Sequence, residues 1–166
     1  MFKIGKIMNI EEKYLEIKDF AYQYFIERLH PELVYHSIKH TFNDVLVAAT
    51  KLAEMEKITP YQAFLLKTAI LFHDFGFIDQ YTANEEIGAA YAGKFLIKFD
   101  FKKEEIDYVK RIILATSVTF KNDTIIQSAG NDILEQLICD ADLDNLGRRD
   151  FWDLSLKLKE ELEIKG

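Results

Sequence analysis

Apolar and polar residues alternate along much of the chain with the period of a helix. In the segment 9–29, apolar residues recur three or four positions apart, which is the spacing of one face of a helix. The aromatic residues of that face are interpreted as core. Segments 102–117 and 133–138 show the same period. A last helix is predicted to start at Asp150, which with Asp153 can cap it, and its apolar face is formed by Phe151, Leu154, Leu158 and Leu162.

A second helix is predicted to open at residues 30–32. Pro31 suits the first helical position, and Glu32 is favourable near the positive end of the helix dipole. At about 100° per residue, His36 and His40 fall on one face of this helix, one turn apart. For either histidine alone, a solvated face is the simpler interpretation. The opposite, apolar face consists of Ile38, Phe42, Val45, Ala49 and Leu52.

The most apolar segment of the chain follows a capping box at residues 59–62, where Thr-Pro-Tyr-Gln predicts a helix start. This helix is expected to run to Asp74 and to be broken at 75–77. It has no polar stripe apart from Lys67 and Thr68, so it belongs in the interior. A buried carboxylate without a partner costs on the order of several kcal/mol. His73 and Asp74 therefore need a cation, a hydrogen-bonding cluster or a metal ion, and metal is our working hypothesis.

A fourth helix is predicted over 82–98, with Thr82 as its cap and Glu85 bonding back to the cap. Because this gives Glu85 a structural role, Glu86 is the acid that we favour for proton transfer. Gly88 and its small neighbours would let another backbone approach closely. Residues 119–129 are polar and aperiodic and are predicted as a loop. The expected fold is all-α, a single-domain helical bundle of about seven helices over residues 1–166.

Composition excludes several functional classes. With 166 residues, 49% hydrophobic and 30% charged, the chain can bury the core of one domain. The formal net charge of -7 opposes binding to a nucleic-acid polymer. The single cysteine, Cys139, excludes an internal disulfide and a multi-cysteine zinc site, and favours a reducing compartment.

The ends of the sequence and its apolar runs give the expected location. Residues 1–6 lack the apolar core of a signal peptide, and no apolar run reaches the roughly 20 residues of a membrane span. We therefore expect a cytoplasmic protein with no membrane partner. The charged end, 159–166, still has the pattern of a helix, which allows for a longer natural chain.

Several motifs of known chemistry are missing or incomplete. The sequence contains no glycine-rich phosphate loop and no Gly-x-Ser-x-Gly elbow. Asp140, Asp142 and Asp144 alternate as in an EF-hand calcium loop. That interpretation fails because Asn145 replaces the required glycine and Phe151 cannot supply the final bidentate carboxylate.

What remains is a set of histidines and aspartates in separate segments, and their order resembles a known superfamily. Segment 35–41 (Tyr-His-Ser-Ile-Lys-His-Thr), segment 69–76 (Ala-Ile-Leu-Phe-His-Asp-Phe-Gly) and segment 139–144 (Cys-Asp-Ala-Asp-Leu-Asp) resemble motifs of the HD-domain metal-dependent phosphohydrolases. Segment 85–89 is similar to the acidic helix start of that superfamily. The resemblance covers roughly residues 30–150 and implies an HD-type helical domain.

The resemblance implies four metal ligands: His40, His73, Asp74 and Asp142, with Asp140 as the fallback for the last. Imidazole and carboxylate donors suit one divalent ion, with Mn, Fe, Co, Ni, Zn and Mg all open. Some members of the superfamily carry further histidines and hold two metals. No histidine follows His73 in this sequence, so we expect one ion per chain and no two-iron oxygen chemistry.

The implied activity is hydrolysis of a phosphate ester of a small molecule, with a nucleotide favoured by family analogy alone. The ion would activate a water molecule for attack on phosphorus. Glu86 is the expected general acid or base, with Asp79 second, and His36 would donate to the phosphate. Further predicted phosphate contacts are Lys39, Lys67 and Arg111.

Two other interpretations stay open. The first is a helical module that senses a nucleotide through its metal pocket without turnover. The second is an interaction protein whose histidines are structural. Type of phosphatase, substrate and native metal are not fixed by the sequence, and a homodimer is compatible with it.

Overall fold

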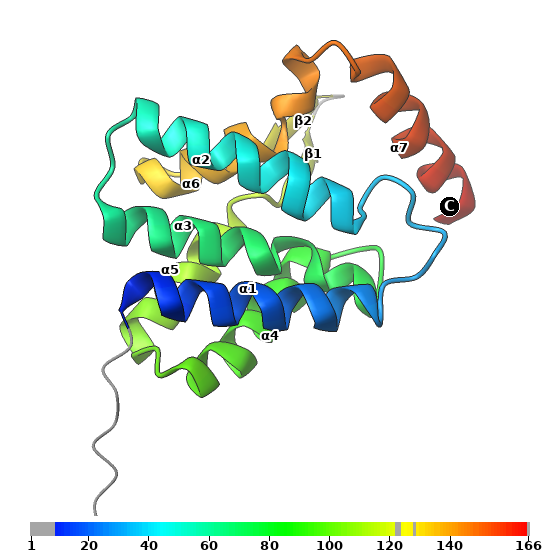
Figure 1. Cartoon of the computed structure of the whole chain (residues 1–166). Helices are drawn as coiled ribbons and strands as arrows, with labels where there is room; N and C mark the ends of the chain where they lie inside the picture. The colour runs from blue at the N-terminus through cyan, green and yellow to red at the C-terminus, as the bar shows by residue number, and fades with distance from the viewer. Residues whose placement is uncertain (1–8, 122–123, 128, 166) are drawn as a thin grey trace, which may run out of the picture.

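The protein is built almost entirely from helices (Figure 1). The computed structural model describes residues 9–121, 124–127 and 129–165. Within these ranges, seven α-helices and one β-hairpin confirm the predicted all-α helical bundle. The α-helices are α1 (Ile10–Ile26), α2 (Leu46–Met55), α3 (Pro60–Phe72), α4 (Asn84–Leu96), α5 (Lys103–Leu114), α6 (Ile133–Asp142) and α7 (Phe151–Lys165), joined by short helical turns η1 (His40–Val45), η2 (His73–Ile78), η3 (Ile97–Phe99) and η4 (Asp144–Gly147).

Helix α3 lies at the centre of the bundle and contacts α1, α2, α4, α5 and α6. The capping box predicts its start correctly: Thr59 N donates to Gln62 Oε1 at 2.9 Å, and Gln62 N donates to Thr59 Oγ1 at 3.2 Å. The helix ends at Phe72, slightly before the predicted end at Asp74, and continues directly into η2. From Phe64 to Phe72 its apolar residues are buried on all sides, as expected for a helix without a polar stripe.

The prediction that a helix opens at Pro31 is wrong. Residues 30–37 form turns, and helical structure begins at Ile38. Ser37 marks this start, because its Oγ accepts a hydrogen bond from His40 N at 3.5 Å, the position that an N-cap serine serves. His36 therefore precedes the helix and does not share a helical face with His40.

The first turns of this helix form a π-helical segment, η1. A π-helix closes hydrogen bonds five residues apart and changes the register of its side chains. His40, Thr41 and Phe42 are consecutive in the sequence and all buried, so the predicted division into an apolar face and a histidine face is wrong at this end. Further along, Val45 and Ala49 are buried as predicted.

Helix α4 begins at Asn84, and Thr82 does not cap it. Ala83 precedes the helix in a left-handed conformation with φ of 54°, and no side chain bonds to the first turn. The small-residue face is confirmed: a Cβ on Gly88 would lie 2.7 Å from the carbonyl oxygens of Phe72 and His73. The backbone of α4 thus packs directly against the turn that carries His73.

The segment predicted as a loop contains two strands, β1 (Val118–Lys121) and β2 (Thr124–Gln127). They pair antiparallel, with Val118 opposite Gln127 and Lys121 opposite Thr124. Residues 122–123 and 128 of the predicted loop lie outside the described residues. Both strands are rich in β-branched and aromatic residues, which favour extended structure despite the weak periodicity.

Helices α5 and α6 form close to their predicted positions. Ile106, Val109, Ile112 and Ile113 of α5 are buried, as the sequence predicts. Asp132 caps α6, accepting from Leu134 N at 2.9 Å. The last residues of α6 bring the chain to Asp142.

Helix α7 lies at the edge of the bundle, and its last turns lie near the segment that joins α1 to η1 (Figure 1). Leu154 is buried as predicted, but Leu162 is 51% exposed and Glu161 is fully buried in its place. The predicted apolar face of this helix is therefore only partly correct. A buried carboxylate at this position requires partners, and these lie beside His36.

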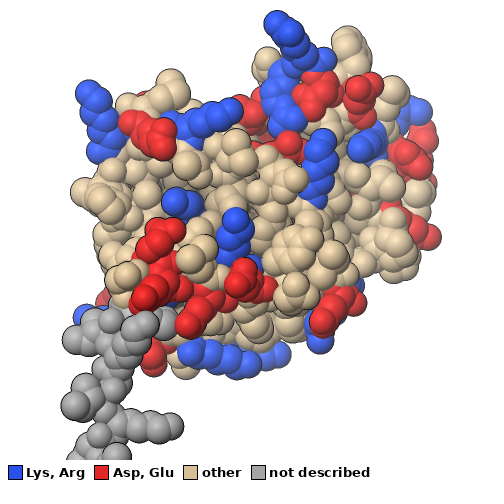
Figure 2. Space-filling view, viewed as in Figure 1, with Lys and Arg blue, Asp and Glu red and all other residues tan. Residues whose placement is uncertain are grey.

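Basic and acidic side chains are interspersed on the face seen in Figure 2, with no single large basic patch there. Among the described residues, no helix combines the length and the apolar character that crossing a membrane requires.

Candidate metal centre

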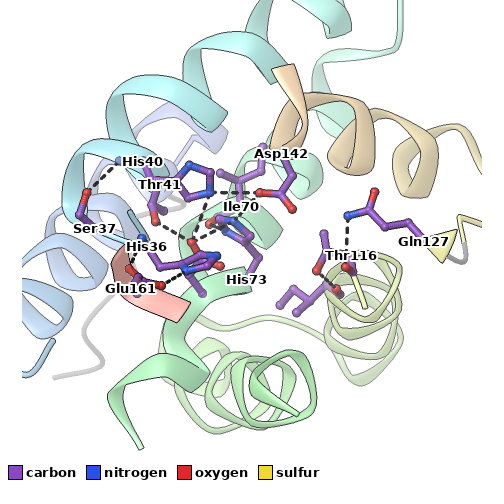
Figure 3. A network of polar contacts seen from close by, with 12 residues as sticks. His36, Ser37, His40, Thr41, Ile70, His73, Thr116, Gln127, Asp142 and Glu161 are labelled. Carbon is purple, nitrogen blue, oxygen red and sulfur yellow. Dashed lines mark hydrogen bonds and ion pairs between the residues drawn. The ribbon is translucent and has the colours of Figure 1, made fainter. Parts of the chain in front are cut away.

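Four of the predicted ligands meet in the interior, although they come from three separate parts of the chain. His40 comes from η1, His73 and Asp74 from η2, and Asp142 from the last turn of α6. Figure 3 shows the two imidazoles and the Asp142 carboxylate pointing toward one another. His73 is 1% exposed, Asp74 5% and His40 6%, so these three residues are buried.

The distances between donor atoms fit a common ion. Asp74 Oδ2 lies 3.6 Å from His40 Nε2 and 3.3 Å from His73 Nε2. Asp142 Oδ1 lies 3.1 Å from His40 Nε2 and 3.6 Å from His73 Nε2. Ligands about 2.0–2.2 Å from one ion are separated by about 3.0–3.5 Å from their neighbours. His40, His73 and Asp74 each offer a donor atom, and these three atoms all lie within 4.8 Å of one another; Asp142 is not part of this group.

The His73 imidazole is oriented as a metal ligand is. Its Nδ1 donates to the carbonyl oxygen of Ile70 at 2.8 Å, which leaves Nε2 with a free lone pair in the neutral ring. Nε2 is buried and is one of two such side-chain atoms that find no hydrogen-bond partner within the described residues. A buried polar atom of this kind needs an explanation, and a coordinated cation supplies one.

The Asp74 carboxylate also has a hydrogen-bond donor within the protein. Thr41, fully buried, donates from Oγ1 to Asp74 Oδ2 at 3.4 Å. The Asp142 side chain is 20% exposed, more than that of Asp74 at 7%. The solvent side of the cluster therefore lies at Asp142.

The electrostatics favour a bound cation. Burial lowers the pKa of His73, but Asp74 and Asp142 outweigh it and raise the pKa to about 9. Burial also raises the pKa of Asp142, but the two imidazoles reverse this and hold it well below its usual range. Two carboxylates thus concentrate negative charge in the interior, where either protons or a metal ion must compensate it.

The donor set fits a divalent ion. Two imidazole nitrogens and carboxylate oxygens suit borderline to hard divalent ions, and the set lacks the thiolates of structural zinc sites. The buried group of His40, His73 and Asp74 could therefore hold a metal ion.

His36 lies beside the cluster but is held by other partners. Its ring stacks on Phe77 with centroids 4.1 Å apart and lies 5.8 Å from the His40 ring. Its Nδ1 contacts the Glu161 carboxylate. Burial lowers the pKa of His36, but the hydrogen bond to Glu161 and nearby carboxylates reverse this and raise it.

The predicted phosphate-binding cations are engaged elsewhere. Arg111 donates to Glu135 at 2.6 Å and to Asp132 at 3.1 Å, at the start of α6, whereas Asp142 lies at its end. Lys67 lies with its Nζ 5.2 Å from the centre of the Tyr14 ring of α1. The structure therefore directs both side chains away from the predicted role. Lys39 is 56% exposed and lies 3.9 Å from Asp44.

The acids chosen for proton transfer are not brought to the cluster. Glu86 is exposed, and it lies on α4 about 160° around the helix axis from Gly88, which faces His73. Asp79 is exposed and accepts hydrogen bonds from Tyr91 Oη at 3.1 and 3.2 Å. The reason for passing over Glu85 also fails, because the residue that caps α4 is Ala83 and the structure shows no capping box there.

The three late aspartates are placed differently. Asp142 approaches both imidazoles, whereas Asp140 is exposed. Asp144 lies 3.9 Å from Arg148, which also pairs with Asp44 at 2.9 Å and so ties η4 to η1.

Sequence reasoning missed residues that support the centre. Thr41 and Ser37 stand inside the quoted motif, and the serine carried the usual signal of a helix cap. Glu161 carried no signal, because it lies in a charged segment that resembles any solvated helix.

Fold and site together define an all-α helical bundle with a buried histidine–aspartate cluster that could hold a metal ion. No family model matches the chain, and no curated protein sequence or solved structure matches it either.

Proposed function

We propose that this protein is a metal-dependent phosphohydrolase that acts on a phosphate ester of a small molecule, with a nucleotide as the favoured substrate. The observation that carries the proposal is the buried His73 Nε2, which lacks a hydrogen-bond partner among the described residues and faces two carboxylates. The sequence resemblance to the HD-domain superfamily supplies the reaction class.

In this proposal, His40, His73 and Asp74 hold the ion, and Asp142 completes the set from the solvent side. A divalent ion bound there supplies a Lewis acid that activates water and polarises a phosphoryl oxygen. Thr41 and the Ile70 carbonyl fix the directions of the ligands through their hydrogen bonds to Asp74 and His73.

His36 is the chain's own donor to a phosphoryl group. The centre of its ring lies 5.8 Å from that of the His40 ring, and stacking on Phe77 holds the ring in place. Because its pKa is raised, the imidazolium form persists closer to neutral pH and can stabilise negative charge on phosphate oxygens.

The proposal is tested by phosphate release from nucleoside mono-, di- and triphosphates with added Mn²⁺, Co²⁺ or Ni²⁺. We expect turnover with at least one ion and loss of at least 100-fold in Asp74→Asn. Asp107→Asn is the matched control, because Asp107 is exposed and pairs only with surface groups of its own helix. Metal binding without release from any of these compounds would instead favour a nucleotide-sensing module.

A further inference from the structure

Helix α7 buries one carboxylate, that of Glu161, against the segment before η1. The Glu161 side chain is fully buried. Its Oε2 accepts hydrogen bonds from Tyr35 N at 2.9 Å and from His36 N at 3.1 Å. Its Oε1 contacts His36 Nδ1. Figure 3 shows Glu161 reaching His36 next to the metal centre.

These three donors form what we call the anion cradle: Tyr35 N–H, His36 N–H and His36 Nδ1–H. Consecutive backbone N–H groups together with a basic side chain are the usual donors to a phosphate or carboxylate. The cradle adjoins the ligand set, because the His36 and His40 rings lie 5.8 Å apart. A phosphoryl oxygen bound there would lie beside the cluster.

Few residues of helix α7 are buried. Leu154 and Glu161 are buried, Phe151 and Leu158 are half-buried, and Lys165 Nζ at the end of the helix donates to Glu32 Oε2 at 3.0 Å. Elements with few buried apolar contacts open at low free-energy cost. Large apolar side chains of α7 are exposed, namely Trp152 at 74%, Leu156 at 63%, Leu162 at 51% and Ile164 at 48%.

A small cavity lies at the end of α7. It has a volume of about 150 Å³, and its lining includes Phe77, Tyr81 and Lys165. Phe77 is also the residue on which the His36 ring stacks. Movement of the last turns of α7 would therefore open the cavity and the cradle together.

We propose that the anion cradle is a phosphate-binding subsite and that Glu161 occupies it when α7 is docked. The ligand class is a phosphate monoester or inorganic phosphate, which displaces the Glu161 carboxylate as α7 lifts. The assignment of this subsite to the substrate rests on the proposed function. The capacity of the cradle to bind phosphate depends on the chain's own donors and can be measured without metal.

The test compares Glu161→Ala with Glu160→Ala in protein freed of metal by a chelator. Glu160 is the adjacent acid and is exposed. Inorganic phosphate is titrated by calorimetry and by thermal shift, with chloride at equal ionic strength as the blank. We expect Glu161→Ala to bind phosphate at least tenfold more tightly than the natural chain, with a melting temperature that rises and then saturates. Glu160→Ala should behave as the natural chain does.

A second pair of variants leaves the cradle intact and decides the question if Glu161→Ala does not fold. Lys165→Ala removes the contact with Glu32, whereas Lys159→Ala removes an exposed pair with Glu163 on the same helix. We expect Lys165→Ala to speed hydrogen exchange of residues 155–165 and to tighten phosphate binding at least threefold, and Lys159→Ala to do neither.

Equal phosphate affinity in the natural chain, Glu161→Ala and Lys165→Ala would overturn the inference. So would a rise in melting temperature that Glu160→Ala shows to the same extent. Tighter phosphate binding by Glu161→Ala without ester hydrolysis under any metal would uphold the cradle and contradict the proposed function. Ester hydrolysis without any change in phosphate affinity would uphold the proposed function and contradict the cradle.

Discussion

His73 Nδ1 donates to the carbonyl oxygen of Ile70, three residues earlier in the chain, at 2.8 Å. This bond fixes the ring so that Nε2 faces the carboxylates of Asp74 and Asp142. The same carbonyl also accepts the backbone N–H of His73 at the end of α3, and its two lone pairs serve both donors. The end of α3 thereby orients the His73 ring as a metal ligand.

Removal of the His73 imidazole should abolish metal retention. We expect the natural chain to hold about one ion per chain and His73→Ala to hold less than a tenth of that, measured by elemental analysis after gel filtration. His30→Ala is the control, because His30 is 55% exposed and lies outside the cluster. Full metal content in His73→Ala would show that the cluster is not the binding site.

The choice between Asp142 and Asp140 can be tested directly. Asp142→Asn should weaken Mn²⁺ binding at least tenfold, because Asp142 Oδ1 lies 3.1 Å from His40 Nε2. Asp140→Asn should change it by less than twofold, because this side chain is exposed. Isothermal titration calorimetry measures both. The opposite ranking would assign the ligand to Asp140.

Metal binding should strengthen as pH rises. In the metal-free fold the pKa of His73 is raised from 6.5 to about 9, so this group contributes stability that is complete below pH 6.5 and lost as pH approaches 9. A metal ion needs the neutral imidazole, so protons compete with it throughout this window. We expect the rise in melting temperature caused by Mn²⁺ to be larger at pH 8.5 than at pH 6.5 by several degrees. A rise that is constant or falls with pH would contradict this.

Gly76 should be indispensable for packing. A Cβ at this position would lie 1.9 Å from the Asn84 carbonyl oxygen. Gly76→Ala should cost about 1–3 kcal/mol or more of unfolding free energy, equivalent to a fall in melting temperature of about 2–4 °C per kcal/mol. Gly147→Ala is the control, because a Cβ there meets nothing within 4 Å. Equal melting temperatures for the two variants would contradict the close packing of η2 and α4.

Local patterns in the sequence predicted the structure correctly where a helix start or an apolar face depends on neighbouring residues alone. The capping box at Thr59, the inward residues of α5 and the small face around Gly88 were all predicted correctly. The start of the second helix was wrong, because Pro31 and Ser37 both carry a start signal and only tertiary packing selects the serine. The hairpin was missed because its strands are short and weakly alternating, so pairing rather than periodicity stabilises them.

By itself, the sequence determined an all-α fold and the residue types that could hold a cation, because helix periodicity and buried ionisable groups are properties of short segments. Only the tertiary structure decided which of these residues meet. It brought His40 and Asp142 to His73, sent Lys67 and Arg111 to other partners, and buried Glu161 against His36. These contacts join residues up to 125 positions apart in the chain, so they depend on how the helices pack, and no local pattern encodes that.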